Sequence, residues 1–282
     1  MKIIFKSFAS GSSGNCYYLG TENEGILIDA GIGIRTIKKC LKDLSLSFEH
    51  IHAILITHDH ADHIKSVATL GEKWHIPIYA TAETYRGINN NRCIKEKLSQ
   101  ANVRYVEKEQ TFQLSGSKSL YAQTVRNFNI TPFEVPHDAT DNVGYKIETP
   151  AGIFCFLTDM GHITPTTAEY IAQANYLIIE ANYDQEMLNM GPYPAYLKQR
   201  IQSGRGHMSN SDTANYLADH FTERMQQIWL CHLSKENNHP ELAFKTFEYC
   251  FKNKGIIIGK DVQLTVLKRT TPSDPFEIQI SE

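Results

Sequence analysis

The 282-residue sequence lacks the features that mark membrane-spanning and secreted proteins. It contains no apolar run of about 18 residues, so we expect no transmembrane helix. Its first seven residues, MKIIFKS, lack the long apolar stretch and small-residue cleavage site of a signal peptide. Internal repeats and low-complexity linkers are also missing. The length suits one large domain or two small ones, either of which can bury a sizeable core.

Cysteine pairs and a strong net charge are missing too. The six cysteines are scattered without a C-x-x-C pair, which excludes a cysteine zinc knuckle and argues against a disulfide scaffold. We therefore expect buried, reduced thiols in a cytoplasmic protein. The net charge of −3 gives no overall attraction to nucleic acid. A polyanionic substrate would have to be attracted by a local basic patch or by bound metal ions.

What the sequence does contain is an alternation of strand-like and helix-like apolar patterns. Strands are predicted at 26–28, 51–57, 76–80, 120–128, 142–148, 153–157, 176–180, 227–232 and 262–267. Helices are predicted at 35–44, 62–74, 164–173, 184–188, 211–223 and 242–252. This order indicates a layered α/β or α+β protein, and the pattern alone does not decide between the two.

The strongest chemical signal is the segment THDHADH at 57–63, where a buried strand gives way to a helix. Histidine is the commonest metal ligand. His58 and His60 are two residues apart, so both rings point the same way in an extended loop. Asp62 and His63 follow at the helix start and turn back toward the same space. One segment can thus supply two ligands to one metal ion and two to a second ion nearby.

One loop cannot complete two coordination spheres, so further ligands must lie downstream. Three candidates lie at the ends of strand-like runs: His137, Asp159 and His232. Polar side chains just past buried strands are where a sheet presents its chemistry. A single histidine after a strand is more often a hydrogen-bonded structural residue. The three together, in this order and after the first motif, favour a shared metal site.

Taken together, these residues resemble the metallo-β-lactamase superfamily and, within it, the YycJ (WalJ) group, which is related to the tRNA-maturing RNase Z. The resemblance covers nearly the whole chain. Besides the His-x-His-x-Asp-His segment, it rests on FASGSSGN at 8–15, HDA at 137–139, TDMG at 158–161, EANYD at 180–184, GHMSN at 206–210 and HLSKENN at 232–238. Two positions depart from the usual pattern. Cys16 stands where a hydroxyl residue is common, and Tyr183 stands where some relatives carry histidine.

The resemblance implies an α/β fold, the four-layer αβ/βα metallo-β-lactamase sandwich, formed by residues 1–282 as a single domain. It also implies hydrolysis of phosphodiesters, since members of the group resemble DNA exonucleases. Carried over by position, it places His58, His60 and His137 on one metal ion, Asp62, His63 and His232 on a second, and Asp159 between the two.

Two residues receive catalytic roles from the same reasoning. Asp62 would orient the attacking hydroxide shared by the two ions and take its proton. His207 resembles the histidine that protonates the leaving group in the nuclease relatives. The alternative for His207 is simple loop packing beside Ser209 and Ser211, which are candidate helix caps.

Further residues around these motifs are also candidates for the site, and two groups of them allow two interpretations each. Lys198, Arg200 and Arg205 precede His207 and would either clamp a nucleic-acid backbone or form a solvated basic face. The glycine- and serine-rich loop at 10–14 would either present backbone N–H groups to a phosphate or form a tight hairpin turn. We expect Glu180 to hydrogen-bond a ligand histidine. His162 is expected to be structural, because the ligand set is already full.

A nitrogen and oxygen ligand set without cysteine suits two Zn²⁺ ions, and Mn²⁺ or Fe²⁺ would also fit. Two divalent ions, two aspartates and a hydroxide leave the site slightly positive, which favours an anionic phosphate. DNA is therefore the expected substrate, with no membrane partner and no prediction of oligomeric state.

Two other functions remain open. A small-molecule hydrolase of the same fold, acting on a thioester, lactone or lactam, would use the same ligands and hydroxide. The modest net charge favours such a substrate, whereas the Gly206-His207 motif and the nearby basic residues favour phosphodiesters. A catalytically idle binding protein is the third function, and the complete ligand set argues against it.

Overall fold

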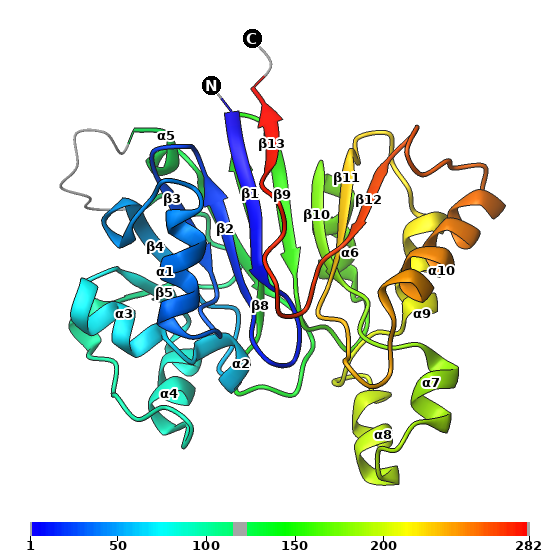
Figure 1. Ribbon diagram of the computed structural model, residues 1–282, viewed down its shortest axis with the longest axis horizontal. Coiled ribbons are helices and arrows are strands. Elements are labelled where there is room, and N and C mark those ends of the chain that lie inside the picture. The colour runs from blue at the N-terminus through cyan, green and yellow to red at the C-terminus, as the bar shows by residue number, and fades with distance from the viewer. Residues whose placement is uncertain (1, 115–122, 281–282) are drawn as a thin grey trace.

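The computed structural model describes residues 2–114 and 123–280, and these form two mixed β-sheets with helices on their outer faces (Figure 1). The first sheet contains, in spatial order, β13 (Phe276–Gln279), β1 (Lys2–Ala9), β2 (Cys16–Gly20), β3 (Gly25–Ile28), β4 (Ile51–Leu55), β5 (Ile78–Ala80) and β6 (Val103–Tyr105). The second contains β12 (Gln263–Val266), β11 (Gln227–Cys231), β10 (Tyr176–Glu180), β9 (Gly152–Leu157), β8 (Val143–Thr149) and β7 (Asn129–Glu134).

Helices cover each sheet on the side away from the other sheet (Figure 1). The first sheet is covered by α1 (Ile34–Lys42), α3 (Val67–Trp74) and α4 (Ala82–Asn90). The second is covered by α6 (Pro165–Gln173), α9 (Asn210–Asp219) and α10 (Pro240–Asn253). The shorter helices are α2 (Ala61–Ile64), α5 (Gln123–Arg126), α7 (Gln185–Met190), α8 (Ala195–Ile201) and the 3-10 turns Phe48–His50 and Gln100–Asn102.

The alternation of side chains along the strands explains the four layers. On β1, Phe5 joins the apolar layer between the two sheets, whereas Ile4 joins the layer beneath the helices. On β11, Trp229 faces the first sheet, whereas Ile228 and Leu230 face the helices of the second. Because both faces of these strands are covered, the strands read as near-continuous apolar runs in the sequence. The four-layer αβ/βα sandwich predicted from the sequence is confirmed.

Parallel pairing of the strands places the predicted site residues at one edge of each sheet. In the second sheet β9, β10 and β11 run parallel, with Leu157 opposite Ile179 and Ile179 opposite Leu230. In the first sheet β3 and β4 are parallel, with Ile28 opposite Leu55. The loops that follow the carboxyl ends of parallel neighbours leave the sheet at the same edge. The polar residues that the sequence places after these strands are therefore neighbours in space.

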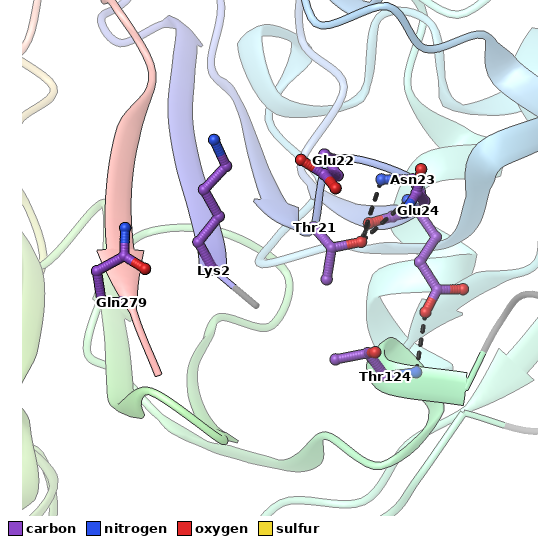
Figure 2. A pocket seen from close by; sticks show the side chains of 7 residues that line it. All are labelled: Lys2, Thr21, Glu22, Asn23, Glu24, Thr124 and Gln279. Carbon is purple, nitrogen blue, oxygen red and sulfur yellow. Dashed lines mark hydrogen bonds between the residues drawn. The ribbon is translucent and has the colours of Figure 1, made fainter. Parts of the chain in front are cut away.

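One strand prediction is wrong where it can be checked. A strand was expected at 120–128, but 115–122 lie outside the described residues and Gln123–Arg126 form the short helix α5. The Glu24 carboxylate accepts a hydrogen bond from the backbone N–H of Thr124 at 2.9 Å (Figure 2). It also accepts one from the backbone N–H of Val125 at 3.1 Å. A carboxylate at a helix N-terminus stabilises the first turn, and this one lies about a hundred residues away in the chain.

The sequence pattern also missed elements that depend on distant partners. The strand β13 pairs antiparallel with β1, from Lys2 opposite Gln279 to Phe5 opposite Phe276, although its own burial is only partial. The helices α4 and α8 and the strands β6 and β7 were not predicted either. The strand expected at 262–267 and the helix expected at 164–173 agree with β12 and α6 to within a residue or so.

Two expectations based on absence can be compared with the described residues. Across 2–114 and 123–280, no helix combines the length and apolar character needed to cross a membrane. All six cysteines fall within these residues, and none forms a disulfide. The assignment of residues 1–282 to a single domain stays a prediction.

Phe5 provides a test of the apolar layer between the sheets. Its ring lies 4.4 Å from the Trp229 ring and 6.0 Å from the Phe156 ring, measured between centroids. Because Phe5→Ala would leave a cavity between the sheets, we expect it to lower the free energy of unfolding by about 3–5 kcal/mol. Chemical denaturation monitored by circular dichroism measures this value. The control Tyr249→Ala, at a position 69% exposed, should change it by less than about 0.5 kcal/mol.

Candidate metal centre

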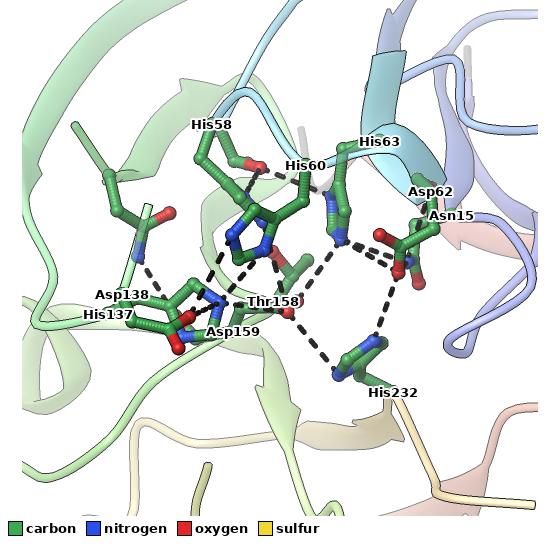
Figure 3. Close-up of polar contacts among 12 residues, drawn as sticks. Asn15, His58, His60, Asp62, His63, His137, Asp138, Thr158, Asp159 and His232 are labelled. Atoms are coloured by element: carbon green, nitrogen blue, oxygen red, sulfur yellow. Dashed lines mark hydrogen bonds and ion pairs between the residues drawn. The ribbon is translucent and has the colours of Figure 1, made fainter. Parts of the chain in front are cut away.

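Five segments bring the seven predicted metal ligands to one edge of the two sheets (Figure 3). The loop after β4 carries His58 and His60, α2 carries Asp62 and His63, and the loops after β7, β9 and β11 carry His137, Asp159 and His232. Most of these side chains are buried, and only those of His60 and Asp62 are partly exposed, at 30% and 23%. The sequence prediction that these residues converge agrees with the structure.

The first group of ligand atoms belongs to His58, His60, His137 and Asp159. Each of these residues offers one atom, and the four atoms lie within 4.8 Å of one another. The distances from Asp159 Oδ2 to His58 Nε2 and to His137 Nε2 are 3.9 and 3.5 Å. His60 Nδ1 lies 3.3 Å from His137 Nε2. Three imidazole rings thus direct nitrogen atoms toward the space beside one carboxylate oxygen, which is an arrangement suited to a cation.

The second group belongs to Asp62, His63 and His232, with Asp159 again at its border. Asp62 Oδ2 lies 3.7 Å from His63 Nε2 and 3.5 Å from His232 Nε2. His63 Nε2 lies 3.3 Å from Asp159 Oδ1. Asp159 Oδ2 lies 3.5 Å from His232 Nδ1 as well as near His58 and His137, so the Asp159 carboxylate contacts histidines of both groups.

Unpartnered buried atoms test whether these residues suit a metal. His58 Nε2, His232 Nε2 and Asp159 Oδ1 are buried and have no hydrogen-bond partner among the described residues. A buried polar atom without a partner costs about 1–3 kcal/mol. These three atoms belong to three different predicted ligands and lie at the centre of the two groups (Figure 3). The donor set therefore fits divalent cations of the kind that imidazole and carboxylate ligands bind.

The second nitrogen of three of these histidines, His63, His137 and His58, contacts a further residue. His63 Nδ1 lies 2.7 Å from Asp29 Oδ2, and Asp29 also accepts hydrogen bonds from the backbone N–H and hydroxyl of Thr57, both at 2.9 Å. His137 Nδ1 donates to the carbonyl oxygen of Gly206 at 2.9 Å. His58 Nδ1 lies 3.0 Å from the Thr57 hydroxyl. Contacts of this type select the ring orientation and tautomer of a metal ligand.

The electrostatics of the site show a balance between buried carboxylates and histidines. Burial opposes ionisation of Asp159, but the charges of His232 and His63 outweigh it and hold the pKa of Asp159 well below its usual range. Burial lowers the pKa of His232, but Asp159, Asp62 and Glu180 together raise it to about 10. The pKa of His63 is likewise raised, because three aspartates outweigh its burial.

His58 and His137 behave differently. Burial lowers the pKa of His58 well below its usual value, and the neighbouring His63 lowers it further. Burial is also the main reason why the pKa of His137 is lowered. The protein thus keeps its carboxylates ionised, stabilises positive charge on one side of the centre and favours neutral imidazole on the other. Neutral imidazole is the form that binds a metal ion.

His207 lies beside the centre and shares a carboxylate with His232. His207 Nδ1 donates to Glu180 Oε1 at 2.7 Å, and His232 Nδ1 lies 2.8 Å from the same oxygen. Glu180 Oε2 accepts the backbone N–H groups of Met160 and Met208, both at 3.1 Å. The expected hydrogen bond from Glu180 to a predicted ligand histidine is confirmed.

Glu180 is fully buried, at the end of β10. Burial raises its pKa, but the charge of His207 and hydrogen bonds from His207 and His232 outweigh this, so the pKa is lowered. Glu180, His207, His232 and Asp159 also lie close enough to form a metal-binding group. The four hydrogen bonds that the Glu180 carboxylate accepts occupy its lone pairs, however, so we interpret it as a residue that orients histidines.

The basic residues expected to bind substrate are close to the centre but have partners within the protein. Arg200 donates to both carboxylate oxygens of Asp138, at 2.5 and 3.0 Å. Arg205 donates to the carbonyl oxygen of His137 at 3.1 and 3.2 Å. Lys198 donates to the carbonyl oxygen of Asn189 at 2.7 Å. Arg200 and Arg205 therefore brace the His137 loop, and substrate binding by all three stays a prediction.

Sequence reasoning missed several residues that shape the centre. Asn15 Nδ2 lies 2.9 Å from His63 Nε2, and the Asn15 backbone N–H donates to the Asp62 carbonyl oxygen at 2.7 Å. Asp138 Oδ1 lies 3.8 Å from His60 Nε2. Asn182 donates to the His232 carbonyl oxygen at 2.8 Å. Asn15, Asp138 and Asn182 each lie within a motif that supported the family resemblance. Their position in these motifs was the one feature of the sequence that could have identified them as residues of the site.

Three further sequence expectations now have structural descriptions. The loop at 10–14 forms a tight turn between β1 and β2, closed by a hydrogen bond from the Gly14 N–H to the Gly11 carbonyl oxygen at 2.8 Å. His162, expected to be structural, contacts the carbonyl oxygen of Gly204 through Nδ1 at 2.6 Å. Ser209 caps α9 by accepting the Asp212 N–H at 3.0 Å.

Comparison with known proteins places this site in a family. Residues 24–228 match the family model of the beta-lactamase superfamily domain. The chain is 32% identical to the exodeoxyribonuclease YycJ of Bacillus anthracis over 279 residues, which cover 99% of both chains. It is 35% identical to the exodeoxyribonuclease WalJ of Streptococcus pneumoniae, with 92% of each chain covered.

A solved structure supports the fold. The metallo-β-lactamase fold protein YhfI of Bacillus subtilis superimposes with a TM-score of 0.68, covering 98% of this chain and 100% of that protein, at 14% sequence identity. At this identity the likeness concerns the fold alone. The family model covers well over half of the chain, and the two curated relatives match over almost their full length. The chain therefore belongs to the metallo-β-lactamase superfamily, in the family that includes YycJ and WalJ.

Proposed function

We propose that this protein is a metal-dependent phosphodiesterase that degrades DNA as an exonuclease. The observation that carries the proposal is the convergence of seven histidine and aspartate residues, three of which point a buried atom without a hydrogen bond into the centre. The YycJ and WalJ relatives, which match over more than nine-tenths of their lengths, are named exodeoxyribonucleases. The names of these relatives support DNA as the substrate class, and the group of histidines and aspartates supports metal-dependent hydrolysis.

We propose that His58, His60 and His137 hold one divalent ion, that Asp62, His63 and His232 hold a second, and that Asp159 contacts both. Zn²⁺ is the proposed native ion, and Mn²⁺ or Fe²⁺ would suit the same donors. When bound, such ions polarise a phosphoryl oxygen and lower the pKa of water toward neutrality. A cytoplasmic location stays a prediction of the sequence.

Asp62 has the position of a proton acceptor. Its carboxylate is partly exposed and faces His63 and His232, at the side of the centre that is open to solvent. Burial raises the pKa of Asp62, but the charges of His63 and His232 outweigh this effect and lower it. The carboxylate is therefore ionised at neutral pH and can accept a hydrogen bond from the attacking water, which it orients toward the phosphorus atom.

His207 has the position of a proton donor. Its Nδ1 donates to the buried Glu180, and this bond leaves Nε2 as the nitrogen that can face a substrate. The side chain is 15% exposed and lies next to the His137 and His232 rings, with ring centroids 5.1 and 5.2 Å away. The Glu180 carboxylate holds the ring in this orientation, so His207 can deliver a proton from Nε2 to the alkoxide that leaves when the phosphodiester breaks.

Arg200 and Lys198 extend this arrangement onto α8. The Arg200 side chain is half exposed although it is paired with Asp138. A phosphate can therefore approach the guanidinium from its exposed side. The phosphate can also replace the Asp138 carboxylate as the partner of Arg200, because Asp138 is itself partly exposed and would remain in contact with solvent. We propose that this face of α8 contacts the DNA backbone on the His207 side of the centre.

The nuclease activity can be tested directly. Metal-loaded protein should shorten end-labelled linear DNA and leave covalently closed circular DNA intact, as measured on denaturing gels with Zn²⁺ and with Mn²⁺. His58→Ala and Asp159→Ala each remove a ligand, so we expect more than about a 100-fold loss of rate and a reduced metal content. His220→Ala, which removes an exposed histidine directly after α9, is the matched control and should keep full activity.

Two results would contradict this function. Absence of DNA cleavage with every ion would exclude the nuclease, and turnover of a thioester in its place would identify the small-molecule hydrolase of the same fold. Cutting of the circular DNA would leave a metal-dependent phosphodiesterase but reject the exonuclease.

The proton donor can be tested by changing the leaving group. For DNA, whose leaving alkoxide must be protonated, His207→Ala should lower kcat by about 10²–10⁴-fold. For a nucleoside p-nitrophenyl phosphate diester, the leaving phenolate is stable without a proton, so the loss should be less than about tenfold. Metal content, measured by mass spectrometry, should not change. Equal losses on both substrates, or loss of metal, would show that His207 acts through folding or metal binding.

A further inference from the structure

A second pocket opens beside the metal centre, on the side of Asp62. It has a volume of about 340 Å³ and is lined by Ser12, Ser13, Gly31, Ala61, Asp62, Lys65, Cys93 and Ile94. These residues come from the turn between β1 and β2, the segment after β3, the helix α2 with its C-terminal flank, and the segment after α4. The roles described so far use only one of them, Asp62.

The pocket borders the metal centre, because Asp62 belongs to both. The Asp62 backbone is held between strands, since its carbonyl oxygen accepts the Asn15 N–H at 2.7 Å and lies against Gly31. A Cβ atom on Gly31 would lie 1.6 Å from that oxygen, so this close approach requires glycine. The backbone of the shared wall is thus rigidly placed, and only the Asp62 side chain turns toward the ligand histidines (Figure 3).

The lining combines an apolar floor with a polar, cationic rim. Ile94 is 8% exposed and Gly31 is also buried, whereas Ser12, Ser13 and Lys65 are exposed. Lys65 forms no ion pair with any described residue, unlike Arg200 on the opposite side of the centre, which is paired with Asp138. Asp62 is the single acidic side chain of the lining, and a bound metal ion would neutralise it.

These properties match one nucleotide of a DNA strand. A volume of about 340 Å³ is near the lower end of the range for ligand pockets, about 300–1,000 Å³, and so admits a single nucleotide unit. The apolar floor offers a surface for a base or sugar, the serine hydroxyls are hydrogen-bond donors for phosphate oxygens, and Lys65 supplies a positive charge. No aromatic, amide or guanidinium side chain lines the pocket, so it has no group for reading base identity.

We propose that this pocket binds the nucleotide next to the scissile phosphate, without sequence preference. The inference rests on the proposed nuclease function. The strand would then run from Lys65 and Ser13, across the metal centre, to Arg200 and His207. Figure 3 shows the same order of landmarks, with Asp62 and Asn15 at one end of the ligand cluster and Asp138 and His137 at the other.

Cys93 allows the position of the nucleotide to be tested without turnover. It is exposed and lies in the pocket lining, whereas the other five cysteines are buried or partly buried. A DNA strand that carries a mixed disulfide on its terminal base can exchange with Cys93, forming a DNA–Cys93 disulfide and releasing the small thiol. We expect cross-linking when the disulfide is on the terminal nucleotides, and more than about tenfold less when it is about ten nucleotides inward.

Variants make this experiment specific. Cys93→Ser should abolish the cross-link, and Ser13→Trp should reduce it severalfold because the indole fills the pocket. Oligo(dT) and oligo(dA) should react equally. Cross-linking that ignores the position of the disulfide, or that survives Ser13→Trp unchanged, would overturn the proposal.

Binding and cleavage provide a second readout. Lys65→Glu should weaken binding of a phosphorothioate oligonucleotide to the Zn²⁺-loaded protein severalfold, and Lys65→Ala should reduce the slope of log affinity against log salt by about one. The matched control is Lys252→Glu, an exposed lysine at the end of α10, which should leave both quantities unchanged.

The two proposals fail in different ways. If the wild type degrades DNA and Lys65→Glu binds and cleaves as the wild type does, the pocket assignment is wrong and the nuclease function stands. If the wild type cleaves neither DNA nor a p-nitrophenyl phosphodiester with any ion, the proposed function fails and the pocket assignment fails with it.

Discussion

The site depends on one buried carboxylate, Asp159, whose negative charge must be balanced inside the protein. It is 2% exposed, and nitrogen atoms of His58, His63, His137 and His232 lie within 3.9 Å of its oxygens. An isolated charge at such a depth costs far more than a folded domain can tolerate, so it must be paired or must bind a metal. The surrounding histidines therefore balance the negative charge of Asp159. Two cations bound among these side chains would balance it as well, and would give the three buried atoms that lack hydrogen bonds a partner.

The contacts behind the ligands form two supports, one from each sheet. Asp29, after β3, fixes His63 and Thr57, while Glu180, at the end of β10, fixes His232 and His207. Asp29 and His232 both have left-handed backbone conformations, with φ of 57° and 53°. Such conformations are uncommon for residues other than glycine and persist where surrounding contacts hold them. Here Asp29 N–H donates to Leu55, and His232 N–H donates to the Ser10 hydroxyl.

The proposed substrate path follows from this layout. The two sheets meet at the ligand cluster, so a strand of DNA that crosses the centre must pass over residues from both halves of the fold. The α8 side would contribute Arg200 and the proposed proton donor His207, whereas the α2 side would contribute Lys65 and the pocket beside Asp62. The net charge of −3 does not oppose this path, because attraction depends on the local charges at the centre and not on the total.

Much of the fold and site was predictable because it is encoded locally. Apolar runs marked the central strands, and polar residues directly after 153–157 and 227–231 marked Asp159 and His232. The strand expected at 120–128 was not predictable, because the helical turn at Gln123–Arg126 is stabilised by Glu24 from another part of the chain. The strand β13 was missed because its weak pattern becomes a strand by pairing with β1.

The sequence by itself determined which side chains are available as ligands and on which strand ends they stand, since these follow from residue type and short-range periodicity. Tertiary structure alone decided which nitrogen of each histidine faces the centre, that Asp159 lies between the two groups, and that Arg200 is paired with Asp138. It also decided that Ser13, Lys65 and Ile94 share a pocket with Asp62. The physical reason is that these relations join segments that are distant along the chain, and the packing of the two sheets brings them together.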